Sequence, residues 1–156
     1  MLPEWKICDV TGSAPENQLL PVAGGVVRLG KTRDHPLYGW DNEFGRHEFE
    51  VDDFKASQFL VSNGQFKPFV DDGGYENRRW WTDEGWNWLD YSKARHPLFW
   101  VETGNGYALR TVASVIDMGW NWPVEVNYLE AKAFCNWLAE KEQKAIRLPT
   151  EDEWYR

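Results

Sequence analysis

Tryptophan is the residue that most constrains the fold of this chain. It occurs 11 times among 156 residues, and aromatic residues together make up 16% of the sequence. Because each large ring can bury roughly 150–250 Å², rings in such number can build a core beneath long loops. The 13 glycines and 8 prolines also favour a loop-rich fold. Six of the large rings fall within a short stretch of the chain: Trp80, Trp81, Trp86, Trp88, Phe99 and Trp100.

Two interpretations of this cluster are open. Exposed rings could stack on a sugar or a cation, as in a lectin-like binding module. Buried rings would instead fill the volume beneath a long loop. No regular period runs through residues 75–106, so we expect a loop there and favour the core role for its aromatic residues.

Charge and hydropathy exclude several classes of function. The net charge is 17 − 25 = −8, without a run of Lys or Arg, so the field of the protein repels nucleic acid. No apolar stretch approaches the roughly 18 residues of a membrane span, and residues 1–8 do not resemble a signal peptide. Cys8 and Cys135 are too few and too far apart for a disulfide scaffold. We therefore expect a cytoplasmic protein without nucleic-acid or membrane partners.

The pattern of the chain predicts short strands and two main helices. Residues 1–21 carry spaced prolines and no periodicity, which is typical of a linker. Turn glycines and alternation predict strands over 24–30, 46–51, 54–61 and 107–113. This order contains no βαβ rhythm and indicates an α+β fold with high irregular content.

Three capping boxes mark expected helix starts. Ser62 with Gln65 opens a helix ending near Gly73, in which Pro68 predicts a kink or a short helix. A second box opens the helix that carries an apolar face at helical spacing. The third lies so near the last residue that we expect the chain to be cut in mid-domain. These second and third boxes pair Asn127 with Glu130 and Thr150 with Glu153.

The residues that could take part in catalysis or metal binding form no local motif. The separations of His35, His47 and His96 match no metal-binding pattern, so structural roles are favoured for all three. Cys135 is expected to be a small packed thiol, and Cys8 to be incidental. Paired acids could help to ligate calcium, but their spacing assembles no complete shell, which favours solvated carboxylates. These pairs are Asp52–Asp53, Asp71–Asp72 and Asp83–Glu84.

Several blocks, in order, resemble the formylglycine-generating (sulfatase-modifying factor) family. The most specific block is Arg147-Leu148-Pro149-Thr150-Glu151 with Glu153-Trp154, near the end of the chain. Earlier blocks match the opening and the two helices of that fold. They include Gly24-Gly25-Val26, Asp41-Asn42-Glu43, Gly73-Gly74-Tyr75, Trp122-Pro123-Val124 and Trp137-Leu138. The resemblance implies a loop-rich, C-type-lectin-like α+β fold over residues 22–156, as the N-terminal portion of such a domain.

Other blocks are similar to one branch, the 5-histidylcysteine sulfoxide synthases of ovothiol biosynthesis. These blocks are Tyr38-Gly39-Trp40, Ala56-Ser57-Gln58, Glu84-Gly85-Trp86 and Pro97-Leu98-Phe99-Trp100. The branch implies a reaction that joins the sulfur of cysteine to the imidazole of histidine, with iron(II) and O₂. Its iron ligands are implied in an upstream DinB-like domain, to which residues 1–21 would be the linker, and a methyltransferase domain often follows. Alternatives are the ergothioneine-pathway sulfoxide synthase, a formylglycine-generating enzyme, and a non-catalytic lectin-like module.

The resemblance marks one candidate site and no catalytic residue. Trp40, Asp41, Asn42 and Glu43 match a family signature, so we expect them to take part in substrate binding. The alternative is that Asp and Asn in a turn bond their own backbone. No residue of this chain matches the family's iron ligands, and the fragment alone is expected to be inactive.

Overall fold

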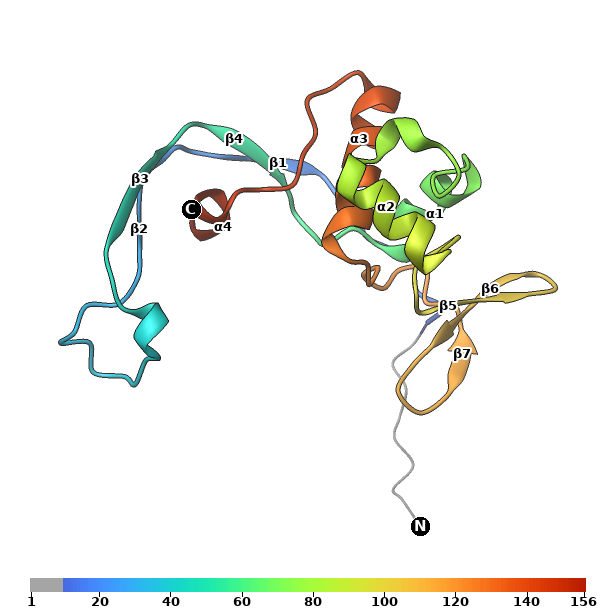
Figure 1. Ribbon diagram of the computed structural model, residues 1–156, viewed down its shortest axis with the longest axis horizontal. Coiled ribbons are helices and arrows are strands. Elements are labelled where there is room, and N and C mark those ends of the chain that lie inside the picture. Colours follow the sequence, from blue (N-terminus) through green and yellow to red (C-terminus); the bar gives the residue numbers. More distant parts are fainter. Residues whose placement is uncertain (1–9) are drawn as a thin grey trace, which may run out of the picture. The chain divides into compact units, whose positions relative to one another are not determined.

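The computed structural model describes residues 10–156 and divides them into two compact units (Figure 1). The helical unit comprises residues 10–17 and 59–148. The ribbon unit comprises residues 18–58 and 149–156. Cys8 and the first nine residues of the predicted linker lie outside the described residues.

Three helices build the helical unit around an aromatic core. They are α1 (Asn63–Asp71), α2 (Asp83–Ser92) and α3 (Tyr128–Glu142), and Figure 1 shows them gathered together. A 3-10 turn, η2 (Arg78–Trp80), precedes α2. The buried cluster between these elements is Phe66, Phe69, Tyr75, Trp80, Trp81, Leu89, Ala133, Phe134 and Trp137.

The aromatic stretch has the core role that the sequence favoured. Trp80, Trp81 and Trp100 are almost fully buried, and Trp86 and Trp88 pack against the same cluster while partly exposed. Outside its own helix, Phe69 contacts rings of the turn after α1, of η2 and of α3, including Tyr75 and Trp137 at centroid distances of 5.8 Å each. Most of these ring pairs are edge-to-face or tilted, and Phe66 and Phe134 are stacked at an interplanar angle of 21°.

The capping boxes expected at Ser62 and Asn127 are both present. Ser62 Oγ accepts from the backbone N–H of Gln65, whose side chain accepts from the N–H of Ser62. Asn127 and Glu130 make the same reciprocal pair at the start of α3. Pro68 lies inside α1, which spans nine residues, so the expected short helix is confirmed.

The expectation of a long loop over residues 75–106 is wrong. This stretch contains η2, α2 and the strand β5 (Trp100–Thr103). Thr82 caps α2 through the N–H of Gly85, and acids occupy its first turn. With Gly85 in place of Glu or Gln, Thr82 does not form a capping box, so this start was missed and the number of main helices was underestimated.

A three-stranded antiparallel sheet completes the helical unit, in the order β5-β6-β7. The strand expected over 107–113 is β6 (Gly106–Arg110), which ends early because residues 111–114 form a turn. Thr111 Oγ1 accepts from the N–H of Ser114 within that turn. The short strand β7 (Val115–Asp117) follows and was not expected from the sequence.

The ribbon unit contains two separate two-stranded antiparallel sheets. β1 (Leu19–Val22) pairs with β4 (Phe54–Ser57), and β2 (Gly25–Leu29) pairs with β3 (His47–Val51). The strands expected over 24–30 and 46–51 are confirmed, whereas the one expected over 54–61 ends at Ser57. β1 also shows that ordered structure begins before residue 22, where a linker was expected. The helix α4 (Glu151–Tyr155) packs against β2 and β3.

The ribbon unit has almost no core of its own. Val27 and Val51 are its only buried apolar side chains among the described residues. α4 is fastened by Arg156, whose Nη2 donates to the carbonyl of Gly24 at 2.9 Å. Its third capping box, between Thr150 and Glu153, is present as expected. The α+β, loop-rich class predicted from the sequence is confirmed, and no helix among residues 10–156 is long and apolar enough to cross a membrane.

Asn63 links three parts of the helical unit through one buried amide. Its Nδ2 donates to the carbonyl of Gly119 at 2.9 Å, and its Oδ1 accepts from Trp100 Nε1 at 2.9 Å. Both bonds lie away from solvent, and Asn63 is 1% exposed. The first residue of α1 therefore fixes the start of β5 and the turn after β7.

We expect Asn63→Ala to lower the free energy of unfolding by about 2–4 kcal/mol, because it leaves a buried indole N–H and a buried carbonyl without partners. Urea denaturation followed by circular dichroism measures the change. Asn105→Ala, in the exposed turn between β5 and β6, is the matched control and should change it by less than about 0.5 kcal/mol. Equal losses in the two variants would contradict the role of Asn63.

Candidate functional site

The four residues expected to bind substrate lie in a closed loop of the ribbon unit, residues 30–45, which we call the Lys31 loop. The N–H of Lys31 donates to the carbonyl of Glu43 at 2.8 Å, and the N–H of Gly45 donates to the carbonyl of Lys31 at 3.1 Å. Gly30 has a φ of +93°, and a Cβ there would meet the carbonyl oxygen of Gly45 at 2.6 Å. Only glycine can therefore occupy position 30, where the two ends of the loop meet.

The side chain of Lys31 organises the interior of this loop. Its Nζ donates to the carbonyl of Tyr38 at 3.0 Å and lies 2.7 Å from Glu43 Oε2. A Cβ on Gly39 would meet Lys31 Cδ at 3.2 Å, so glycine permits the close approach. The hydrogen bond from Lys31, followed by the one from the backbone of Trp40, lowers the pKa of the Glu43 carboxyl below its ordinary value.

The structure brings one of the four predicted residues into this network and turns the others outward. All four residues are exposed, but only Glu43 is paired with Lys31. Residues Asp41–Glu43 form the 3-10 turn η1, in which Asp41 Oδ1 accepts from the N–H of Asn42. The local bonding expected as the alternative is thus present, and it leaves Asp41 Oδ2 and the Asn42 amide facing solvent.

Exposed polar groups of this kind can bind and orient a partner through hydrogen bonds. Sequence reasoning missed Lys31, the residue that shapes the loop. Its partner Glu43 lies twelve residues away, and no local pattern connects positions at that distance in an irregular segment.

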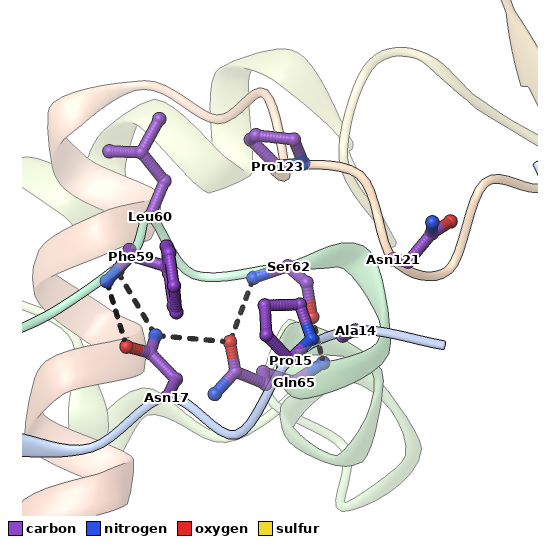
Figure 2. Close-up of a pocket in the computed structure, with 9 residues that line it drawn as sticks. All are labelled: Ala14, Pro15, Asn17, Phe59, Leu60, Ser62, Gln65, Asn121 and Pro123. Carbon is purple, nitrogen blue, oxygen red and sulfur yellow. Dashed lines mark hydrogen bonds between the residues drawn. The ribbon is translucent and has the colours of Figure 1, made fainter. Parts of the chain in front are cut away.

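A second feature, in the helical unit, is an apolar cleft of about 270 Å³ (Figure 2). One wall is the extended segment before β1, held by Asn17. The amide of Asn17 accepts from the N–H of Phe59 and donates to its carbonyl, both at 3.0 Å, in the manner of a paired strand. The residues that line the cleft are Ala14, Pro15, Asn17, Phe59, Leu60, Ser62, Gln65, Asn121 and Pro123.

This cleft has the character of a docking site rather than a reaction site. None of its nine lining residues is ionisable, so it offers no acid, base or metal ligand. Its polar groups are largely occupied, since Gln65 Oε1 already accepts from Ser62 and Asn17. The buried Asn121 Oδ1 has no hydrogen-bond partner within residues 10–156. An apolar group could enter the cleft, but no bond-breaking chemistry follows from its lining.

The three histidines do not form a cluster, and only His35 belongs to the Lys31 loop. His35 Nδ1 accepts from the N–H of Leu37 in a turn, as expected. His96 packs its ring edge-to-face on Tyr107 at 5.3 Å. His47 stacks on Phe49 and lies 3.5 Å from Asp152, but its side chain is exposed rather than packed in a core.

At least one acid of each predicted pair has a structural partner, and the thiol of Cys135 is buried. Asp72 accepts from Trp137 Nε1, Asp53 accepts from the N–H of Gly24, and Asp83 pairs with Arg78. Burial raises the pKa of the Cys135 thiol, as expected for a packed, unreactive cysteine.

The described residues do not fit an iron centre. Residues 10–156 contain no group of three or more His, Cys, Asp or Glu side chains placed to hold a metal ion. Two-residue contacts, such as His47 with Asp152, supply too few ligands for iron. No chemical step of the protein can therefore be derived from these residues through a bound metal.

We expect Lys31→Met to loosen the Lys31 loop without unfolding the ribbon, because it removes both side-chain bonds and keeps the aliphatic stem. Amide hydrogen exchange of residues 38–45 should become several-fold faster, and the pKa of Glu43 should rise toward its ordinary value of 4.5. Because the fold lowers the pKa of Glu43, the ionised carboxylate stabilises the fold at pH values above its ordinary pKa. This stabilisation is lost as the pH falls through the lowered pKa. Lys55→Met, on an exposed site of β4, should leave both observables unchanged.

The chain is similar in sequence to proteins named hercynine oxygenase and formylglycine-generating enzyme. It is 38% identical over 123 residues to a hercynine oxygenase of Mycolicibacterium thermoresistibile, covering 78% of this chain and 25% of that protein. It is 32% identical over 145 residues to the hercynine oxygenase of Mycolicibacterium smegmatis, covering 92% and 31%. The formylglycine-generating enzyme of Bos taurus is 26% identical over 172 residues, covering 90% and 39%.

The chain thus spans between a quarter and two fifths of the length of these relatives. The sulfatase-modifying factor enzyme 1-like domain matches residues 9–156, which is nearly the whole sequence. The ordered blocks at 24–30, 41–43 and 147–154, the capped helices and the loop-rich α+β architecture agree with that match. The chain therefore belongs to the family of the sulfatase-modifying factor enzyme 1-like domain.

Proposed function

We propose that this chain is part of an iron(II)- and O₂-dependent sulfoxide synthase that couples the sulfur of cysteine to the imidazole of histidine, as in ovothiol biosynthesis. The family match and the similarity to proteins named hercynine oxygenase support an oxidoreductase. The observation that carries the proposal is the run of branch-specific blocks that surround Tyr38-Gly39-Trp40 and Pro97-Leu98-Phe99-Trp100.

A second candidate is the ergothioneine-pathway synthase, which acts on trimethylhistidine with another thiol. The names of the relatives favour it, because three hercynine oxygenases share 32–38% of aligned residues with this chain. A formylglycine-generating enzyme is less well supported, at 26% identity. The lectin-like module has lost its main support, since Trp80, Trp81 and Trp100 are buried in the core.

In the whole protein we propose that the iron is bound outside these 156 residues, by histidines of an upstream DinB-like domain. The described residues assemble no ligand set of their own. Residues 1–21 would connect to that domain, and residues 22–156 would form the first part of the formylglycine-type domain. A downstream methyltransferase domain is part of the same proposal, as is a cytoplasmic location.

We further propose that Asp41 and Asn42 contact a substrate in that whole protein. Both lie in the η1 turn, and each has a polar group free of partners within the described chain. An amino-acid substrate carries an ammonium group that a carboxylate such as Asp41 can bind. The Lys31–Glu43 pair would hold the turn in place rather than touch the substrate.

We expect the whole protein, with iron(II), O₂, cysteine and histidine, to form the histidylcysteine sulfoxide, detected by mass spectrometry. Its kcat/KM should favour histidine over trimethylhistidine by at least about tenfold, because a pocket shaped for one amine discriminates against a bulkier one. The 156-residue chain is the control, and should neither retain iron after desalting nor form product. Preference for trimethylhistidine would select the second candidate, and turnover by the 156-residue chain would refute the placement of the iron.

We expect Asp41→Asn in the whole protein to raise the KM of one substrate several-fold and to leave kcat nearly unchanged, because it removes a charge used in binding. Steady-state kinetics measure both constants. Glu125→Gln, which removes an exposed carboxylate of the helical unit, is the matched control and should change neither. A fall in kcat without a change in KM would contradict a role restricted to binding.

A further inference from the structure

The dipeptide Asn-Gly occurs twice in this chain, at Asn63–Gly64 and at Asn105–Gly106. It is the sequence at which a backbone nitrogen most easily attacks the preceding side chain, because glycine carries no Cβ to hinder the approach. Asparagine is for this reason one of the thermolabile residues of proteins. The two copies share their reactive atoms, so their surroundings in the fold decide whether each of them reacts.

The fold protects the first copy. Asn63 is 1% exposed, and both ends of its side-chain amide are hydrogen-bonded. The nitrogen of Gly64 is also engaged, since its N–H donates to the carbonyl of Trp120 at 2.8 Å. The attacking nitrogen and the amide it would attack are thus held by other partners, and water is excluded. Asn63 can react only when this part of the helical unit opens.

The second copy is exposed in the β5–β6 hairpin, whose connection extends away from the helices in Figure 1. The side chain of Asn105 makes no hydrogen bond within residues 10–156. Gly106 has a φ of +120°, and nothing lies within 4 Å of the place that a Cβ would take. It pairs with Thr103 at the last position of the ladder, where strand pairing opens most readily. The nitrogen, the amide and water can therefore meet here while the rest of the unit stays folded.

We propose that Asn105 is a site of spontaneous modification, at which the side-chain amide is lost through a succinimide. The backbone nitrogen of Gly106 forms a bond to Cγ of Asn105, and the bond from Cγ to Nδ2 breaks. Nδ2 leaves as ammonia with the proton of the Gly106 N–H. Water then opens the ring: cleavage at Cγ leaves aspartate, and cleavage at the backbone carbonyl carbon leaves isoaspartate. No metal or substrate takes part, so the inference is independent of the proposed function.

The modification changes both the charge and the geometry of the hairpin. Either product adds one negative charge to a chain whose net charge is −8. Isoaspartate also routes the main chain through the side-chain carbon, which lengthens the connection between Thr103 and Gly106 by one backbone atom. Because the length of the connection fixes the register of a hairpin, we expect this pair to be lost. Trp100 and Leu109, at the other end of the ladder, should stay paired.

The test is incubation of the 156-residue chain under native, mildly alkaline conditions in water enriched in heavy oxygen, followed by digestion at acidic pH and peptide mass spectrometry. Heavy oxygen marks the conversion that occurs during the incubation. Asn105 should be converted at least about tenfold faster than Asn63, which reacts only from an opened state. The products should include isoaspartate, which direct hydrolysis of the amide does not form. The rate should rise with pH, because the attacking nitrogen must lose its proton.

Unfolding gives the matched control, because it removes the difference in surroundings and keeps both dipeptides. In concentrated urea, Asn105 and Asn63 should be converted at similar rates. Equal rates under native conditions would overturn the proposal, as would aspartate formed without isoaspartate. A preference for Asn105 that persists in urea would also overturn it, since the cause would then lie in the neighbouring sequence and not in the fold.

A substitution tests the site itself. Asn105→Gln keeps the amide but would require a six-membered ring, so conversion at position 105 should fall to background while that of Asn63 is unchanged. The side chain is exposed and makes no hydrogen bond within the described residues, so the variant should fold like the parent, which circular dichroism checks. Conversion at position 105 at the rate of the parent chain would show direct hydrolysis and refute the succinimide.

Discussion

The helical unit depends on a buried carboxylate at the start of its longest helix. Glu130 is 3% exposed, and both of its oxygens are used: Oε2 accepts from the N–H of Asn127 and Oε1 from the hydroxyl of Tyr75 at 2.6 Å. The first bond caps the N-terminus of α3, and the second links α3 to the segment after α1. Burial raises the pKa of Glu130, while its hydrogen bonds act in the opposite direction. A carboxyl group that is otherwise costly to bury thereby joins α3 to the segment after α1.

The rest of the core follows from this joint. Tyr75 contacts Phe69 and Trp81, and Trp81 Nε1 donates to the carbonyl of Gly74 at 2.8 Å. Around its edge, two tryptophans repeat one arrangement in which the indole N–H binds a carboxylate and a cation lies over the ring. Trp137 does so with Asp72 and Lys141, and Trp80 with Glu140 and Arg79. The buried tryptophans, Trp80, Trp81, Trp100 and Trp137, are accommodated because each of their indole N–H groups has a hydrogen-bond partner.

Sequence reasoning predicted the parts of this fold that are encoded locally. The caps at Ser62, Asn127 and Thr150 depend on residues three positions apart, and each was found where it was expected. The ribbon strands β2 and β3 alternate clearly and were also found. α2 was missed because Gly85 breaks the capping pattern and because its tryptophans suggested a loop.

The candidate site was predicted only through family resemblance, and its geometry could not have been. The residues Trp40 to Glu43 have no periodicity, and the turn they form depends on Lys31, which is remote in sequence. The same limit applies to Asn63, whose partners Gly119 and Trp100 lie 56 and 37 residues away. Contacts of this range arise from packing of the whole unit, and a single sequence carries no local trace of them.

The glycine neck of the Lys31 loop has a consequence for how members of this family can diverge. Position 30 faces the carbonyl of Gly45 so closely that a side chain cannot enter, whereas Gly45 itself has open space around it. Between these two points the backbone is bound to itself and to Lys31, not to the ribbon. The two ends of the loop are thus fixed relative to each other by backbone hydrogen bonds. Insertions or exchanges between positions 32 and 42 would leave the register of β2 and β3 unchanged.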